Sequence, residues 1–169
     1  FKIIRLMKKI GILGDIGSGK TFVAKKFDCP VFVADDEVSK IYSKNKFFFN
    51  KLKKKLPKYI KSFPIKKKEI ISAILENKNN LKKITNIIHP IVRKEMSKFL
   101  IKNKKKKIVV LDIPLLLENK LHDKKFILIY IDANKKNIMK RLHKRKNFDL
   151  KIFKSFKKLQ LPIKIKKKK

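Results

Sequence analysis

The sequence is poor in several residue types that mark particular classes of protein. It has one cysteine, no tryptophan, four glycines and, among 49 basic residues, four arginines. The single cysteine, Cys29, excludes an intramolecular disulfide and favours a reducing, cytoplasmic compartment. Beside Pro30 it is interpreted as a packing residue rather than a nucleophile. No apolar run approaches the roughly 18 residues that cross a membrane, and the start lacks a signal peptide, so we expect no membrane partner.

Acidic residues are also scarce, and the 13 Asp and Glu leave a formal net charge of +36. Clustered basic charge is typical of proteins that bind nucleic acids or anionic membranes. Here the excess is almost entirely lysine, in a sequence rich in Ile, Asn and Phe. These residues have A/T-rich codons, so the lysine content is interpreted as a consequence of an A/T-rich genome. We expect no specific nucleic-acid partner. The lysine runs are interpreted as solvated surface or loops, at residues 53–55, 66–68, 104–107 and 166–169.

Short apolar runs alternate with amphipathic segments, and 169 residues suit one domain, which together predict a single α/β domain. Strands are predicted at residues 10–13, 31–33, 108–111 and 126–131. The last two are continuous apolar runs, typical of strands buried on both faces of a parallel sheet.

Helices are predicted in the remaining periodic segments, at residues 21–27, across 38–99, from 138 to 142 and from 149 to 159. Asp149 is expected to cap the last of them. Within 38–99, the prolines Pro57, Pro64 and Pro90 are expected to separate successive helices.

One glycine-rich motif carries the chemistry. The segment from Gly14 to Thr21 fits G-x-x-x-x-G-K-[S/T] and falls between a predicted strand and a predicted helix. In such a loop backbone N–H groups point at phosphate oxygens, Lys20 reaches the β- and γ-phosphates, and the Thr21 hydroxyl binds Mg²⁺. We therefore predict a nucleotide site formed by Gly14, Asp15, Ile16, Gly17, Ser18, Gly19, Lys20, Thr21 and Phe22.

Other motifs narrow the class of nucleotide enzyme. GTPases need a D-x-x-G and an N-K-x-D segment, but residues 112–115 have no glycine and residues 119–122 lack the final acid. The small size and the helical region favour a kinase of small metabolites. An alcohol acceptor needs a carboxylate for its proton, and Asp35 and Asp36 follow the second strand. The alternative for this pair is an acidic cap on the next helix.

The residues from about 8 to 160 resemble the dephospho-CoA kinase family, which phosphorylates the 3′-hydroxyl of dephospho-CoA to give coenzyme A. The shared motifs are, in order, Gly14–Thr21, Ala34-Asp35, Ile88-His89-Pro90 and Leu111–Glu118. The resemblance implies an ATP-dependent phosphotransferase with a three-layer P-loop fold, a mostly parallel sheet and helices on both faces. It also implies a core at about 8–35 and 106–169, a helical acceptor-binding insertion at about 36–105 and a lid at about 141–148.

The resemblance also assigns roles on the acceptor side. Asp35 would be the general base on the 3′-hydroxyl, with Asp36 as the alternative because Val33 replaces the family's first aspartate. His89 and Arg93 would bind dephospho-CoA. His89 could instead be a residue at a helix boundary.

On the nucleotide side, Arg141 and Arg145 would be lid residues that stabilise charge on the transferring phosphoryl group, and Asp112 would hold Mg²⁺ together with Thr21. The alternatives are solvated charges for the two arginines and a loop cap for Asp112. The family's last strand, which follows the region of Gln160, is expected to be missing, and residues 1–6 are expected to be a non-native extension.

The predicted protein is thus a cytoplasmic monomer that uses ATP and Mg²⁺ and acts on a small molecule, dephospho-CoA. Two other functions stay open. One is a P-loop kinase with a nucleoside monophosphate type of acceptor. The other is a basic, nucleic-acid-associated P-loop ATPase, for which the net charge of +36 is the support.

Overall fold

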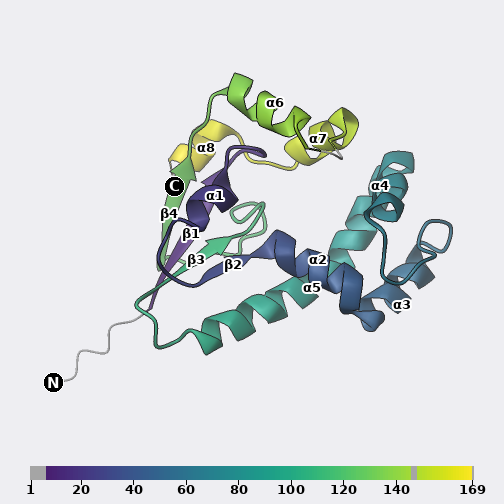
Figure 1. Cartoon of the computed structure of the whole chain (residues 1–169), viewed down its shortest axis with the longest axis horizontal. Coiled ribbons are helices and arrows are strands. Elements are labelled where there is room, and N and C mark those ends of the chain that lie inside the picture. Colours follow the sequence, from purple (N-terminus) through teal and green to yellow (C-terminus); the bar gives the residue numbers. More distant parts are fainter. Residues whose placement is uncertain (1–6, 146–147, 169) are drawn as a thin grey trace. The chain divides into compact units, whose positions relative to one another are not determined.

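The computed structural model describes residues 7–145 and 148–168, and its helices and strands fall into two units (Figure 1). The first combines Phe1–Ala34 with Phe99–Lys169, and the second is Asp35–Lys98. The expected N-terminal extension at residues 1–6, and residues 146–147 of the predicted lid, lie outside the described residues.

The first unit is built on a parallel sheet in the order β2-β3-β1-β4, which confirms the predicted parallel α/β architecture. The strands are β1 (Lys8–Gly14), β2 (Val31–Val33), β3 (Ile108–Asp112) and β4 (Phe126–Ile131). In the register, Ile10 pairs with Val110 on one side and Ile127 on the other. This pairing brings the ends of β1 and β3 together, although Gly14 and Asp112 are 98 positions apart along the chain.

Burial differs between the two strands that were predicted to be buried on both faces. The prediction is confirmed for β3, whose last four residues are all buried. It is wrong for β4, where Ile127 is 45% exposed. The reason is that β4 ends the order of the described sheet and pairs with β1 alone, so its apolar run reflects half-buried packing.

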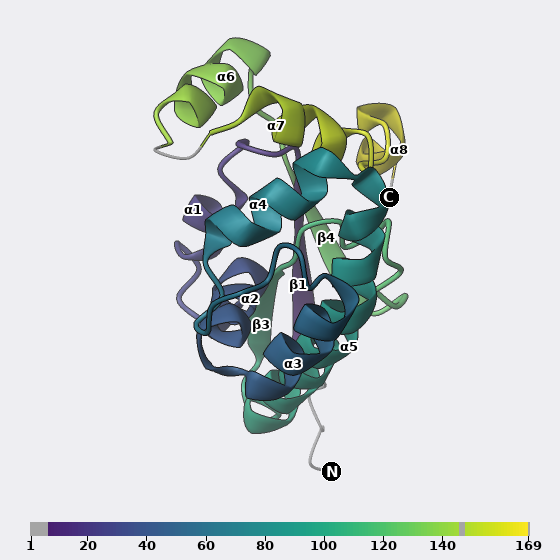
Figure 2. The same ribbon diagram turned by 90° about the vertical axis from the view of Figure 1, so that its right-hand side faces the viewer.

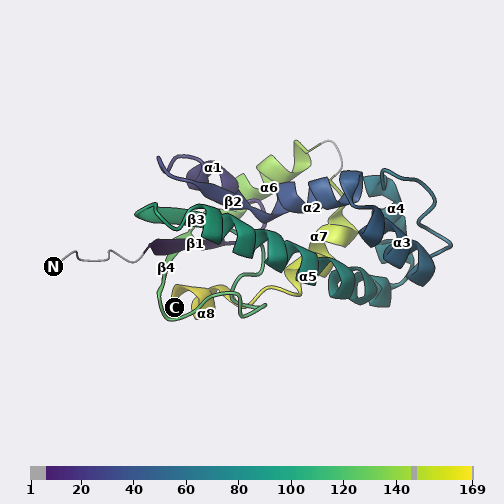
Figure 3. The ribbon, with the colours of Figure 1, turned by 90° about the horizontal axis from the view of Figure 1, so that it is seen from below.

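Four short helices belong to this unit: α1 (Lys20–Ala24), α6 (Lys135–His143), α7 (Leu150–Lys157) and α8 (Ile163–Lys167). Figures 2 and 3 show α1 and α8 on opposite sides of the strands. Asp149 caps α7 as predicted, because its side chain accepts a hydrogen bond from the backbone N–H of Ile152 at 2.9 Å. Two predicted ends are wrong: α1 stops at Ala24 rather than residue 27, and α7 stops at Lys157 rather than 159.

One side of the sheet packs into a small apolar core. Its buried members are Ile10, Ile12, Ala24 and Val110, and Cys29 packs against them from the loop before β2. Burial raises the pKa of the Cys29 thiol, and the nearby Asp28 raises it further. The neutral, packed thiol confirms that Cys29 is a packing residue.

The second unit is helical and contains α3 (Lys46–Lys55), α4 (Lys67–Glu76) and most of α2 (Ala34–Lys44) and of α5 (Lys78–Lys102). Its core includes Phe48 and Leu52, which are fully buried. The Asn45 side chain begins α3 by accepting the backbone N–H of Phe48 at 2.8 Å. Across the residues that the structure describes, no helix is long and apolar enough to cross a bilayer.

Pro90 does not separate two helices, contrary to the prediction, and lies inside α5. A proline there removes one backbone hydrogen bond and crowds the preceding turn. The helix nevertheless continues, because Ile84 and Ile88, just before Pro90, are buried at 3% and 5% exposure. Pro57 and Pro64 do fall between α3 and α4, as predicted.

Candidate functional site

The glycine-rich loop joins β1 to α1 and depends on glycines at its turning points. Gly17 and Gly19 have φ angles of 84° and 100°, in the left-handed region that L-residues with side chains rarely adopt. A Cβ on Gly17 would lie 3.0 Å from Leu142 Cγ and 3.2 Å from Ile138 Cγ2, both on α6. A Cβ on Gly19 would lie 3.3 Å from Arg141 Nη1. The loop therefore needs glycine here for both its backbone conformation and its close approach to α6.

Lys20, the first residue of α1, turns its ammonium back across the loop. Its Nζ donates hydrogen bonds to the backbone oxygens of Gly14 at 3.1 Å and of Asp15 at 2.8 Å. The backbone N–H of Ser18 donates to the Asp15 oxygen at 3.1 Å, which closes the turn. A positive group is thus held over a curled backbone, an arrangement suited to phosphate oxygens.

Thr21 and Asp112 come together from distant parts of the sequence. The Thr21 hydroxyl donates a hydrogen bond to Asp112 Oδ2, and Asp112 ends β3 with 3% of its surface exposed. Mg²⁺ prefers oxygen ligands and is commonly held by one or two carboxylates together with substrate phosphates. The donor set fits that ion. Among the described residues, no group of three or more His, Cys, Asp and Glu side chains could hold a metal ion. A Mg²⁺ ion at Thr21 and Asp112 would therefore need further oxygen ligands from a substrate.

The structure brings one of the two predicted lid arginines to the loop. Arg141, on α6, donates from Nη1 to the backbone oxygen of Ser18 at 3.0 Å. Arg145 lies two residues beyond the end of α6, and its side chain is exposed. Phe22, also predicted at the site, is 69% exposed, with Lys26 Nζ 5.4 Å from the centre of its ring.

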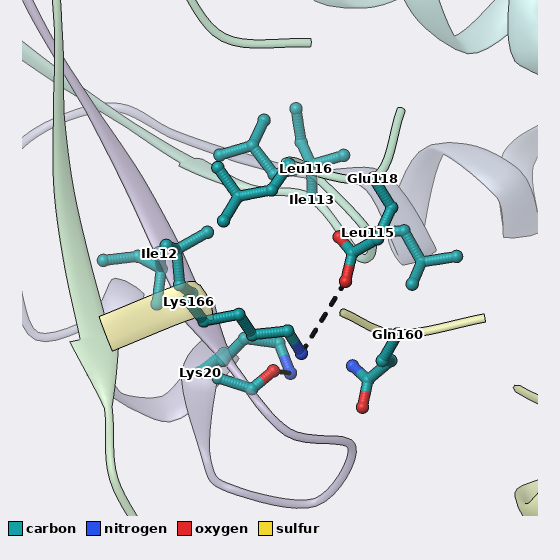
Figure 4. A pocket seen from close by; sticks show the side chains of 11 residues that line it. Ile12, Lys20, Ile113, Leu115, Leu116, Glu118, Gln160 and Lys166 are labelled. Carbon is teal, nitrogen blue, oxygen red and sulfur yellow. Dashed lines mark hydrogen bonds and ion pairs between the residues drawn. The ribbon is translucent and has the colours of Figure 1, made fainter. Parts of the chain in front are cut away.

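Lys166 contradicts the prediction that the lysine run 166–169 is solvated. Its side chain is 3% exposed, and its Nζ lies 3.6 Å from Asp15 Oδ1 and 3.7 Å from Glu118 Oε1. Figure 4 shows Lys20 and Lys166 reaching into one cavity, which Glu118 and Gln160 also line. The fold buries this lysine because α8 packs against β1 and brings two carboxylates to its ammonium.

The remaining predicted residues belong to the helical unit. Asp35 and Asp36 lie in the first turn of α2, where negative charge stabilises a helix. Burial lowers the pKa of the His89 imidazole, and Arg93 lowers it further, so His89 is neutral near pH 7. His89 lies inside α5, so the alternative that it marks a helix boundary is wrong.

Sequence reasoning missed Lys166, Glu118 and Gln160 as neighbours of the loop. Glu118 ends the Leu111–Glu118 motif, but the motif assigns no role to this side chain. Nothing in the sequence distinguishes Lys166 from the lysines around it, because its burial depends on partners more than 45 residues away.

Residues 8–169 match the family model described as "Dephospho-CoA kinase". A dephospho-CoA kinase of Wolbachia sp. subsp. Brugia malayi is 33% identical over 163 residues, which cover 94% of this chain and 83% of that protein. A dephospho-CoA kinase of Bartonella henselae is 34% identical over 119 residues, covering 68% and 60%.

Two solved structures share the fold. TT1252 from Thermus thermophilus aligns over 97% of this chain and 85% of its own, with a TM-score of 0.76 and 23% identity. A dephospho-CoA kinase from Campylobacter jejuni aligns over 96% and 84%, with a TM-score of 0.61 and 24% identity. The family model, the relatives and the fold agree with the site, in which a phosphate loop lies beside the oxygen groups of Thr21 and Asp112. The chain belongs to the dephospho-CoA kinase family, whose members transfer a phosphoryl group from ATP to dephospho-CoA.

Proposed function

We propose that the chain carries out the last step of coenzyme A synthesis, the ATP-dependent phosphorylation of the 3′-hydroxyl of dephospho-CoA, with the residues assigned below. The observation that carries this assignment is the meeting of Lys20, Thr21 and Asp112 where β1 and β3 end. In a doubly wound parallel fold, ligands bind at the carboxyl ends of the strands.

On the nucleotide side, the loop from Gly14 to Phe22 would hold the triphosphate. Phosphoryl transfer relies on positioning and on neutralising the charge of the moving group. Lys20 would bind the β- and γ-phosphates, and Arg141 would donate to the γ-phosphate, which its hydrogen bond to the Ser18 oxygen supports. Arg145, which follows on the same segment, would join it in the lid at about 141–148.

Mg²⁺ would be held by Thr21 and Asp112 together with phosphate oxygens, and when bound it neutralises charge on the transferring group. The hydroxyl of Thr21 would coordinate directly. The buried carboxylate of Asp112 would accept hydrogen bonds from a coordinated water.

On the acceptor side, Asp35 would accept the proton of the 3′-hydroxyl, with Asp36 as the alternative. Two observations support Asp35: it follows Val33 by two residues along the chain, and Val33 is the register partner of Asp112. His89 and Arg93 would bind dephospho-CoA from the helical segment at about 36–105. The neutral imidazole of His89 can donate and accept hydrogen bonds to such a ligand.

We also propose that the enzyme acts in the cytoplasm as a monomer, without a specific nucleic-acid partner. The single cysteine supports a reducing compartment. The arginine-poor composition of the basic surface supports the absence of specific nucleic-acid recognition, because bidentate contacts to bases depend mostly on arginine.

The test is release of ADP from Mg-ATP in the presence of dephospho-CoA, with AMP, CMP and single-stranded DNA as competing candidates. Of these acceptors, we expect only dephospho-CoA to support release of ADP, and we expect Lys20→Ala to abolish this turnover. Asp35→Asn should lower kcat by roughly 10² to 10⁴ while the Kd of Mg-ATP stays constant, because a general base acts on the acceptor. Asp36→Asn is the matched control. A larger loss in Asp36→Asn would transfer the role of base to Asp36, and turnover with AMP instead of dephospho-CoA would refute the acceptor.

A further inference from the structure

Lys166 is a buried charge in a protein covered with exposed ones. Lysines are almost never fully buried unless their ammonium is paired, because removing the charge from water is costly. Here the ammonium has two partners, Asp15 Oδ1 at 3.6 Å and Glu118 Oε1 at 3.7 Å, whose side chains are 14% and 13% exposed. Three charged groups are therefore gathered in one poorly hydrated place.

That place adjoins the phosphate loop. Asp15 is the second residue of the loop, and its backbone oxygen accepts a hydrogen bond from Lys20. The cavity lined by Gly14, Lys20 and Lys166 measures about 10 Å³, room for about one water molecule. The ammonium of Lys166 thus lies at the same small cavity as Lys20, beside the loop (Figure 4).

The chain around Lys166 is anchored by the same carboxylate. Glu118 Oε1 accepts the backbone N–H of Leu161 at 2.8 Å, just before α8 begins, and lies 3.7 Å from Lys166 Nζ. One oxygen therefore ties the segment leading into α8 and the ammonium that α8 carries. Glu118 lies in the segment that follows β3, so this segment fixes the position of Lys166 relative to the loop.

Charge decides what the arrangement does. Without the ammonium, two carboxylates would stand beside a loop that has to accept the negative triphosphate, and like charges at such a poorly hydrated site repel strongly. With it, one positive charge offsets part of their negative charge and lies 3.6 Å from the Asp15 carboxylate.

We propose that Lys166 is a positioning residue for nucleotide binding: it holds Asp15 and Glu118 and cancels part of their charge, so that the loop binds Mg-ATP. In this role it acts through the two carboxylates, which lie 3.6 and 3.7 Å from its ammonium, and not on the transferring group. The inference rests on the proposed function in one respect, that the loop binds ATP, and it does not depend on the identity of the acceptor.

The experiment compares Lys166→Met, which keeps the apolar stem and removes the charge, with Lys167→Met on the same helix. Lys167 is the matched control because it is exposed and its ion pair with Asp132, at 2.5 Å, is exposed too. The Kd of Mg-ATP is measured by calorimetry on the full chain, and kcat and KM for ATP are measured with dephospho-CoA. In Lys166→Met we expect the Kd and KM of ATP to rise roughly tenfold or more, with kcat at saturating ATP within about threefold. In Lys167→Met all three should stay within about twofold of the wild type.

Charge compensation separates this role from simple packing. Adding Glu118→Gln to Lys166→Met removes one unpaired carboxylate, and the Gln oxygen can still accept the N–H of Leu161. We expect the double variant to regain at least about threefold in the Kd of Mg-ATP, whereas a packing defect would not be repaired by a second substitution. Lys166→Arg, which keeps the charge, should bind Mg-ATP more tightly than Lys166→Met.

Equal Kd values in Lys166→Met and Lys167→Met, or a double variant no better than Lys166→Met, would overturn the proposal. If Lys166→Met does not fold, the single variant Glu118→Gln decides. It makes the surroundings of the loop more positive and should bind Mg-ATP at least as tightly as the wild type, and weaker binding by the folded variant would overturn the proposal. Failure of the wild type to turn over dephospho-CoA would instead refute the proposed function, since the comparison of Kd values needs no acceptor.

Discussion

Gly17→Ala tests the conformation of the phosphate loop directly. Gly17 has a φ of 84°, and an L-residue with a side chain loses about 1–2 kcal/mol in the left-handed region. The new methyl group would also lie 3.0 Å from Leu142 Cγ and 3.2 Å from Ile138 Cγ2. These two side chains are 2% and 7% exposed, so they cannot move away into solvent. Overpacking of this kind costs about 1–3 kcal/mol.

The two costs together come to about 2–5 kcal/mol, and the loop can avoid them by leaving its present conformation. We therefore expect Mg-ATP to bind at least about 30-fold more weakly, because 1.4 kcal/mol corresponds to about a factor of ten in affinity. The assay is calorimetric titration with Mg-ATP, beside thermal unfolding to show that the variant is folded. A folded Gly17→Ala protein that binds Mg-ATP within threefold of the wild type would refute the argument from the φ angle and the close contact.

A double-mutant cycle separates the strain from the clash. Leu142→Ala removes the Cγ and Cδ2 atoms nearest to the new methyl group but leaves the φ of residue 17 unchanged. If crowding contributes, Gly17→Ala should weaken Mg-ATP binding less in the Leu142→Ala background, by a coupling energy of about 1 kcal/mol or more. If the two effects simply add, the contact with Leu142 contributes nothing, and the loss comes from backbone strain and from the remaining contact with Ile138 Cγ2.

Two further predictions concern stability. His89→Gln should flatten the dependence of unfolding free energy on pH: the folded pKa of His89 is lowered, so its contribution is full above about pH 7 and is lost as the pH falls through 6.5 towards the folded value. Denaturant unfolding at pH 7.5 and 5.5 should show a smaller difference in the variant, and an equal difference would contradict the burial of a neutral imidazole. Phe48→Ala should lower the free energy of unfolding by about 3–5 kcal/mol, because Phe48 is fully buried. Phe47→Ala should lower it by about 1 kcal/mol or less, because Phe47 is 60% exposed. Similar losses in the two variants, measured by urea unfolding, would show that the core of the helical unit is not where we place it.

Several features could be predicted because they depend on residues close together in the chain. The spacing of Gly14, Gly19 and Lys20 predicts a strand, a turn and a helix without reference to the rest of the molecule. Asp149 predicts the start of α7 in the same way. In each case the hydrogen bonds that stabilise the conformation join residues a few positions apart.

Other predictions failed where packing overrides local preference. Pro90 predicts a break between helices, but α5 continues through it beside the buried Ile84 and Ile88. The apolar run of β4 predicts burial on both faces, but the order of the described sheet places it at an edge. Local propensities amount to a few kcal/mol, which tertiary contacts of a long helix or a sheet can outweigh.

Local sequence patterns predict the phosphate loop and the alternation of strands and helices, and they indicate Thr21 and Asp112 as candidate ligands of Mg²⁺. The tertiary structure decided that Thr21 and Asp112 touch, since this follows from the pairing of β1 with β3. It also decided that Lys166, one lysine among dozens, is buried. A charged side chain leaves water only when partners of opposite charge compensate for the lost hydration, and for Lys166 those partners are Asp15 and Glu118, brought from 151 and 48 residues away by the fold.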